Sequence, residues 1–232
     1  MAMRGFFFRG SGLAFAALVA ARASLRAAEG EAKIVSRTLV SAGKPRTDVL
    51  YVPEGLPADR PAPLVLTLHG SGRNGRSLVS GWQDLARKEG IVLAGPDATD
   101  SQHWSAPADG PALLRDVVED VRAIRQIDPR RMCAAVHAGA LQPSQYSISN
   151  DARRKIPIQI AIGDRDEFFV MADARATVEA LKAAGFPAEI VEMRFHNHDY
   201  SSSAGKINRT AWEFLSRATL PADPRYAEYR AR

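Results

Sequence analysis

The sequence of 232 residues contains a single cysteine, Cys133. One cysteine cannot form an internal disulfide framework, and it cannot supply the ligands of a cysteine-based zinc site. An isolated cysteine more often fills a small buried apolar position than acts as a reactive thiol. The chain must therefore be stabilised by an ordinary hydrophobic core.

Clusters of lysine and arginine interleaved with aromatic residues are also missing from the sequence. The formal net charge of +5 is spread along the chain, so we expect no nucleic-acid partner. With 46% hydrophobic and 25% charged residues, the composition is that of one soluble globular domain with a sizeable core. We also expect no cofactor and no bound metal.

The first 28 residues have the layout of a secretory signal peptide. Arg4 and Arg9 precede a short apolar stretch at residues 12–20, and Ala27-Ala28 offers a small-residue cleavage site. The stretch is too short for a helix that spans a membrane, so we expect no stable membrane insertion. A disordered or amphipathic N-terminal extension is the alternative. If the signal peptide is real, the mature protein is secreted or periplasmic.

From residue 33 onward, hydrophobic patterning predicts alternating strands and helices. The predicted strands cover residues 33–40, 47–52, 63–68, 91–94, 133–137, 156–162 and 188–193, with 63–68 and 156–162 central. The predicted helices cover residues 77–89, 112–127, 172–184 and 206–220, the second ending where Pro129 blocks continuation. This alternation indicates one α/β domain over residues 33–220, a mostly parallel sheet with helices on both faces. Residues 221–232 are predicted to be a polar tail.

The sequence has no Gly-x-Ser-x-Gly turn, yet polar motifs follow three of the predicted strands. They are Leu68-His69-Gly70-Ser71-Gly72, Gly163-Asp164-Arg165-Asp166 and His196-Asn197-His198. Their order is that of an oxyanion loop, an acid and a base around a missing serine nucleophile. Each motif also has a simpler explanation, because glycine-rich turns can bind phosphate or merely turn, aspartates cap helices, and histidines pack.

Further motifs extend this pattern along the chain. They include residues 63–72, 95–97, 116–117, 128–131, 163–169, 196–200 and 208–215. Over residues 35–217 the set resembles α/β-hydrolases of the polyhydroxybutyrate depolymerase and feruloyl esterase group. The resemblance implies that a serine attacks an ester carbonyl of a small or polymeric substrate.

The resemblance also implies roles for individual residues. Asp166 is the acid and His196 the base, with His198 as second choice because Phe195 stands where a glycine usually precedes the base. Gly70, Ser71 and Gly72 form part of the oxyanion hole. Trp104 either lines a substrate pocket or is a packing residue.

The segment that should carry the serine is missing. In the resembling proteins a strand, the elbow and a helix follow the Asp-Pro-x-Arg motif, whereas here Arg131 leads directly into the strand at 133–137. About thirty residues are therefore absent, since a strand with its crossover helix needs that length. An alignment that makes residues 136–139 the elbow is rejected, because no helix and strand follow them. The gap either divides the sheet or lets residues 133–137 take the elbow strand's place, and it uncovers an apolar patch.

Two substitutes for the missing chemistry are disfavoured. Cys133 lacks the flanking glycines that a strained nucleophile turn requires. His196 and His198 could form a metal pair, but no further histidine or cysteine follows them at a suitable spacing.

Three hypotheses remain. The favoured one is an esterase-like chain that lost its nucleophile segment and is inactive or nearly so. The second is a non-catalytic protein of the same fold that binds an ester or aromatic ligand. The third is an active enzyme with an unrecognised nucleophile.

Overall fold

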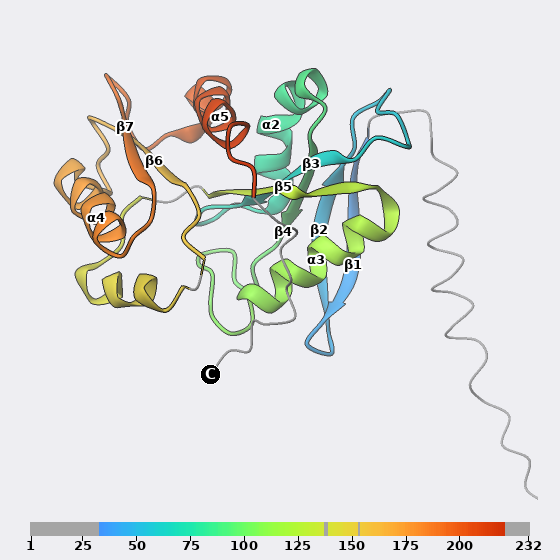
Figure 1. Cartoon of the computed structure of the whole chain (residues 1–232), viewed down its shortest axis with the longest axis horizontal. Coiled ribbons are helices and arrows are strands. Elements are labelled where there is room, and N and C mark those ends of the chain that lie inside the picture. The colour runs from blue at the N-terminus through green and yellow to red at the C-terminus, as the bar shows by residue number, and fades with distance from the viewer. Residues whose placement is uncertain (1–32, 137–138, 153, 221–232) are drawn as a thin grey trace, which may run out of the picture. The chain divides into compact units, whose positions relative to one another are not determined.

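A computed structural model describes residues 33–136, 139–152 and 154–220. The predicted signal peptide and the predicted polar tail lie outside the described residues. Helices and strands alternate along the described chain, as the patterning predicts, and Figure 1 shows their arrangement.

The larger sheet has five strands in the order β1-β2-β4-β3-β5. The β1–β2 hairpin is antiparallel, β2 pairs antiparallel with β4, and β3 pairs in parallel with both β4 and β5. The strands are β1 (Ile34–Ser41), β2 (Lys44–Tyr51), β3 (Ala62–Leu68), β4 (Val92–Pro96) and β5 (Ile127–Val136). β3 and β4 are apolar runs buried along almost their whole length, as expected for strands covered on both faces.

A second, two-stranded sheet consists of β6 (Ile158–Gly163) and β7 (Ala188–Met193), which are parallel. The prediction that residues 156–162 form a central strand of one sheet is therefore wrong. Within the described residues β6 pairs with β7 alone. Between β5 and β6 the described chain forms a 3-10 helix (Pro143–Asp151), and no described strand pairs with both β5 and β6 to join the sheets.

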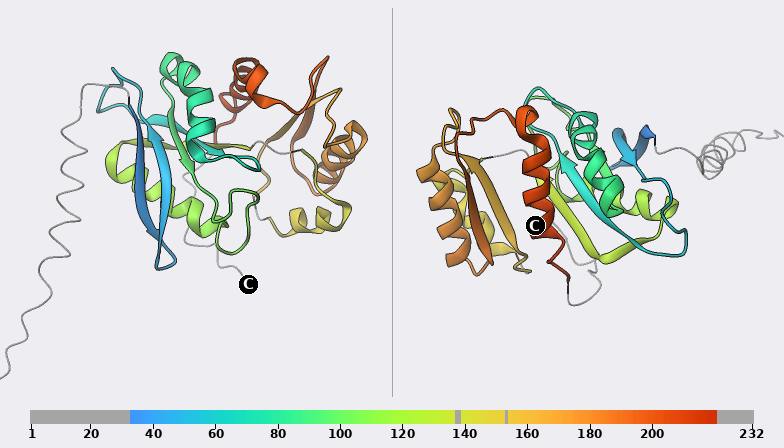
Figure 2. Two further views of the ribbon diagram at one scale, coloured as in Figure 1. Left: turned by 180° about the vertical axis from the view of Figure 1, so that it is seen from behind. Right: turned by 90° about the horizontal axis from the view of Figure 1, so that it is seen from above.

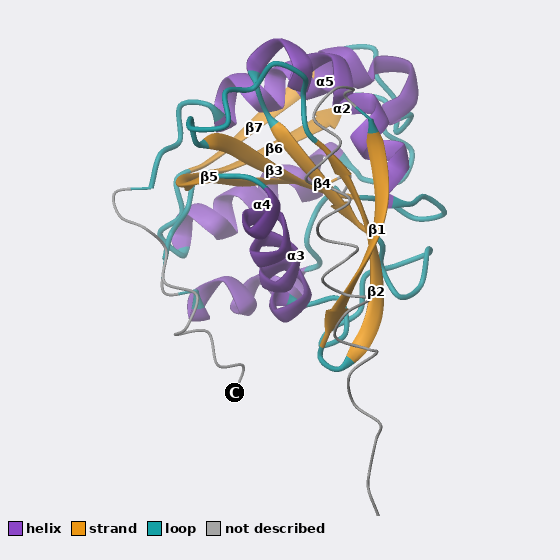
Figure 3. Ribbon diagram, turned by 90° about the vertical axis from the view of Figure 1, so that its right-hand side faces the viewer, coloured by secondary structure: helices purple, strands orange, loops and turns teal. Residues whose placement is uncertain are grey.

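Helices cover both sides of the strands, with α2 and α5 on one side and α3 and α4 on the other (Figure 3). The views in Figure 2 show β6 and β7 beside α4, away from the β1–β2 hairpin. The helices are α2 (Gly75–Glu89), α3 (Pro111–Ile124), α4 (Met171–Ala183) and α5 (Tyr200–Leu215). The α3 side holds the main core, in which leucine and valine side chains of α3 pack on β1 to β5.

Helix α2 lies unusually close to the sheet at its first residue, Gly75. A Cβ atom on Gly75 would lie 2.0 Å from the carbonyl oxygen of Gly95 in β4, so only glycine fits there. Asn74 caps the helix by accepting a hydrogen bond from the N–H of Ser77, and Gly90 ends it in the left-handed conformation. This contact places the turn before α2 at the carboxyl edge of β3.

Three predicted helix boundaries are wrong by three residues or more, and one of them is the end of the last helix, which lies at Leu215 instead of 220. The helix predicted to end at residue 127 ends at Ile124, because Ile127 already pairs with Ala62 of β3. The next pair is Leu64 with Met132, so the residues around Pro129 form a bulge in β5 that needs no ladder hydrogen bond from the proline. The last helix begins at Tyr200 instead of 206, since the Asp199 side chain accepts the N–H of Ser201 and caps it.

The missing segment was predicted either to divide the sheet or to let residues 133–137 take the place of the elbow strand. The structure shows part of each. Residues 132–136 of β5 pair with residues 64–68 of β3, where the elbow strand was expected. The division between β5 and β6 nevertheless remains. Val136, the last residue of β5, and Ile156, which precedes β6, are both exposed.

Candidate active site

The loops that follow β6 and β7 bring a carboxylate and an imidazole together. Asp166 Oδ2 lies 2.9 Å from His198 Nδ1, although the residues are 32 positions apart in sequence. The Asp166 side chain is 8% exposed and that of His198 is 26% exposed. The hydrogen bond requires Nδ1 of His198 to carry the proton, which leaves Nε2 as the basic nitrogen of the neutral ring.

The loop backbone holds Asp166 in position. Its Oδ1 accepts the N–H groups of Phe168 at 2.9 Å and Phe169 at 2.8 Å. Burial alone would raise the pKa of Asp166, but the hydrogen bonds from His198 and from these two N–H groups outweigh it and lower the pKa. The carboxylate is thus ionised at neutral pH and able to stabilise a protonated imidazole.

Of the two histidines, the one predicted as second choice for the base is the one that faces Asp166. His196, the first choice for the base, forms no side-chain hydrogen bond among the described residues, whereas His198 faces Asp166. Phe195 adopts a left-handed backbone with φ of 60°, and this turns the chain at His196. The carbonyl of His196 then accepts the N–H of Arg165 at 2.9 Å, so His196 contributes its backbone to the loop contact.

The glycine-rich turn after β3 is fixed to the loop at residues 97–110. The hydroxyl of Ser71 donates to Gln102 Oε1 at 2.9 Å, and the N–H of Gly72 donates to the carbonyl of Ser101 at 2.8 Å. The Gly72 N–H is therefore occupied, which leaves Gly70 and Ser71 as the backbone donors of the predicted oxyanion set. No sequence signal identified Ser101 and Gln102, because the contacts are between distant loops.

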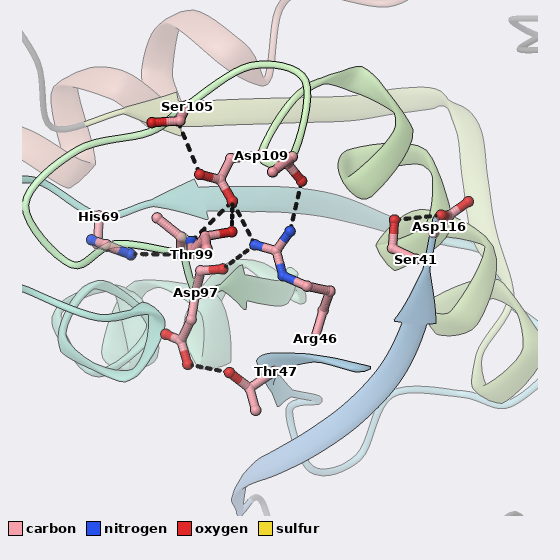
Figure 4. A network of polar contacts seen from close by, with 11 residues as sticks. Ser41, Arg46, Thr47, His69, Asp97, Thr99, Ser105, Asp109 and Asp116 are labelled. Atoms are coloured by element: carbon pink, nitrogen blue, oxygen red, sulfur yellow. Dashed lines mark hydrogen bonds and ion pairs between the residues drawn. The ribbon is translucent and has the colours of Figure 1, made fainter. Parts of the chain in front are cut away.

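His69 connects the same loop to the sheet (Figure 4). Its Nε2 accepts the N–H of Ala98 at 3.0 Å, and its Nδ1 lies 2.9 Å from the carbonyl of Gly70. Only a neutral imidazole protonated at Nδ1 satisfies both contacts. The Trp104 indole donates to the carbonyl of His69 at 2.8 Å, and its ring lies 5.1 Å from the imidazole.

Trp104 is held by packing and by one hydrogen bond. The half-buried indole packs against the α3-side core, and its N–H donates to the carbonyl of His69. Its role in lining a substrate pocket stays a prediction.

Asp109 organises the loop at residues 97–110, and sequence reasoning missed it. Its carboxylate accepts the Thr99 N–H at 2.9 Å, the Thr99 hydroxyl at 2.8 Å and the Ser105 N–H at 2.9 Å, and it pairs with Arg46 of β2 at 2.6 Å (Figure 4). Burial would raise the pKa of Asp109, but these hydrogen bonds outweigh burial and lower it. An aspartate in a loop gives no sequence signal of such a role.

The turn after β3 adjoins the start of α5. A cavity of about 30 Å³ lies between them, lined by Gly70, Arg73, Ser77, Leu78, Tyr200 and Ser201. The Tyr200 hydroxyl donates to Asn208 Oδ1 at 2.9 Å, and the Asn208 amide donates to the carbonyl of Gly81 in α2 at 2.8 Å. The fold thus brings the predicted oxyanion turn to the segment that follows His198.

Cys133 lies in the middle of β5, opposite Val65 of β3, rather than on a turn. Burial raises the pKa of its thiol to about 11, so the reactive thiolate is scarce at neutral pH. After β5, Gly139 lies directly against the ring of Phe169, where a Cβ atom would be 2.0 Å from that ring. Phe169 in turn lies 5.5 Å from the His198 ring, so the chain that leaves β5 approaches the Asp166–His198 pair.

Within the described residues no group of three or more histidine, cysteine, aspartate and glutamate side chains could hold a metal ion. In the same part of the chain no helix is both long enough and apolar enough to cross a membrane.

Comparison with known proteins supports the fold. No protein family model and no curated protein matches the chain. A thermostable esterase superposes with a TM-score of 0.58 at 18% identity, over 80% of this chain and 63% of that one. A ferulic acid esterase gives 0.62 at 12% identity, over 80% of this chain and 98% of its own. A poly(3-hydroxybutyrate) depolymerase from Bordetella parapertussis superposes with a TM-score of 0.60 at 15% identity, over 88% of this chain and 96% of that one.

These similarities are similarities of fold. The chain spans less than two thirds of the thermostable esterase and nearly the whole length of the other two. Together with the sheet order, they establish that this chain has an α/β-hydrolase fold, as the sequence motifs predicted.

Proposed function

We propose that this protein is an esterase-like α/β-hydrolase that keeps the acid, the base and the oxyanion turn but lacks the nucleophilic serine. The observation that carries the proposal is the Asp166–His198 pair, with Nδ1 and Oδ2 2.9 Å apart on the loops that follow β6 and β7. In ester hydrolysis such a pair removes a proton from the attacking group, and backbone N–H groups stabilise the oxyanion that forms.

Without a serine, the nucleophile available to this pair is water. His198 Nε2 would take a proton from water, the water oxygen would attack the ester carbonyl, and Asp166 would stabilise the imidazolium. The proton would then pass to the departing alcohol. No acyl-enzyme forms on this route, and the rate is limited to what general-base activation of water, substrate binding and the oxyanion turn supply. We therefore expect slow or undetectable turnover.

The test is hydrolysis of p-nitrophenyl acetate by the purified chain and by three variants. Asp166→Ala and His198→Ala remove the pair, and His196→Ala is the matched control. If the pair acts as a general base, His198→Ala lowers the enzymatic rate by about 10²–10⁴-fold and His196→Ala changes it little. A burst of p-nitrophenol followed by fast turnover would reveal an acyl-enzyme and overturn the proposal that the nucleophile is missing.

A ligand-binding function without catalysis is the second candidate. It is favoured by the aromatic surroundings of the pair, because the Phe168 and Phe169 rings lie 5.0 and 5.5 Å from the His198 ring. If the parent chain hydrolyses ester no faster than His198→Ala, this candidate replaces the first. The ligand would be an ester or a related acid with an apolar group.

We also infer that residues 1–28 direct export, which makes the mature protein secreted or periplasmic. The test is to express the full chain with its N-terminus intact and to determine the N-terminal sequence of protein from the periplasm and the medium. A mature chain that begins near residue 29 supports export. An intact Met1 in a purely cytoplasmic product contradicts it.

A further inference from the structure

Two arginines and a phenylalanine form an unassigned surface on the loops that hold the Asp166–His198 pair. The Arg165 guanidinium lies 4.9 Å from the centre of the Phe195 ring, and that of Arg194 lies 5.5 Å from it. Both distances are within the range of a cation–π contact. Phe195 is nevertheless 69% exposed, so its ring is available to a ligand.

The loops that carry these arginines also carry carboxylates: Asp164 accepts the N–H of His196 at 3.3 Å, and Glu167 accepts the N–H of His198 at 3.2 Å. Neither Arg165 nor Arg194 forms an ion pair with an acidic side chain among the described residues, in contrast to Arg175 nearby, which pairs with Glu192. An arginine presents a planar fork of donors that matches a carboxylate. Each guanidinium group is therefore available to pair with an anionic group of a ligand.

The backbone at Phe195 gives an independent reason to look for a role. A bulky side chain at φ of 60° is rare, because this conformation favours glycine. The loop nonetheless carries an exposed aromatic ring here. On the loop after β6, Phe168 carries another exposed ring, 71% accessible, whose centroid lies 5.0 Å from that of the His198 ring.

We propose that Arg165, Arg194 and Phe195 bind a small organic carboxylate with an aromatic or other apolar body. The apolar body lies against the Phe195 ring and the carboxylate pairs with the guanidinium groups. This inference rests on the proposed function in one respect, namely that the region around His198 receives an ester or its acid. It adds that the ligand carries a negative charge.

The test is isothermal titration of the full chain with three probes. 3-Phenylpropionate carries both features, its amide lacks the charge, and propionate lacks the ring. We expect saturable binding of 3-phenylpropionate, at least about tenfold tighter than either of the others. Binding should weaken as salt is added, because the paired groups are exposed.

Variants locate the site. The double variant Arg165→Gln and Arg194→Gln should lose this preference for the carboxylate, while Arg87→Gln on α2, an exposed arginine on another element, should keep it. Phe195→Leu should weaken all probes that carry a ring.

The inference is overturned if the amide binds as tightly as the acid, if the double variant binds as the parent does, or if no probe saturates. A parent chain that hydrolyses ester no faster than His198→Ala disproves the catalytic proposal but leaves the carboxylate site intact. The two failures are therefore distinguishable.

Discussion

The ion pair between Arg46 and Asp109 should dominate the stability of the loop that carries Trp104. The Asp109 side chain is fully buried and that of Arg46 is 11% exposed. Asp109→Ala removes the acceptor of the Thr99 and Ser105 N–H groups and leaves Arg46 without its counter-charge. Breaking a buried pair by removing one partner typically costs 3–5 kcal/mol.

The structure places the expected cost at the lower end of this range. Thr99 and Ser105 are exposed, so their freed N–H groups can bind water, and Arg46 keeps hydrogen bonds to the carbonyls of Asp97 and Ala108. We therefore expect Asp109→Ala to lower the free energy of unfolding by about 3 kcal/mol. A domain is stable by only about 5–15 kcal/mol, so this loss is readily measured.

The assay is urea unfolding followed by tryptophan fluorescence, with Asp84→Ala as the matched control. Asp84 pairs with Arg87 on the surface of α2, and its removal should cost less than about 1 kcal/mol. Because the folded pKa of Asp109 is lowered, its contribution is present above the unfolded pKa of about 3.9 and is lost as pH falls through the folded pKa. The difference between parent and Asp109→Ala should therefore shrink below about pH 4. Equal destabilisation by the two variants at pH 7 would refute the reasoning.

Three further predictions concern the backbone and the thiol. Phe195 has a φ of 60°, a conformation that favours glycine, so Phe195→Gly should be more stable than Phe195→Ala by about 1 kcal/mol in urea unfolding. This is the reverse of the usual order of the two residues. Equal stabilities would show that the backbone is unstrained. Gly75→Ala should destabilise the fold strongly or prevent folding, because its Cβ would lie 2.0 Å from the carbonyl oxygen of Gly95. Gly205→Ala in α5, where a Cβ would meet nothing within 4 Å, should raise the free energy of unfolding by about 0.5–1 kcal/mol. Thermal unfolding of both variants checks these expectations. Cys133, with a pKa of about 11, should react with iodoacetamide at pH 8 roughly 100-fold more slowly than the same thiol in urea-unfolded protein, and comparable rates would contradict its burial.

The α/β-hydrolase fold was predictable because its signals are local. Apolar runs at β3 and β4 mark strands covered on both faces, and residues 188–193 were predicted with the bounds that β7 has. The chain order of the oxyanion turn, Asp166 and the histidines was also visible in the sequence. Parallel strands share a direction, so the motifs that end β6 and β7 lie at the same edge of their two-stranded sheet.

The sequence by itself therefore determined the class of fold, the order of the motifs and the absence of a Gly-x-Ser-x-Gly turn. Tertiary structure alone decided that His198 and not His196 faces Asp166, since the choice depends on how a turn at Phe195 meets the loop after β6. It also decided that β6 leaves the main sheet, and that Asp109 and Trp104 brace the turn after β3. These features rest on contacts between residues far apart in sequence, and local propensity carries no information about such contacts.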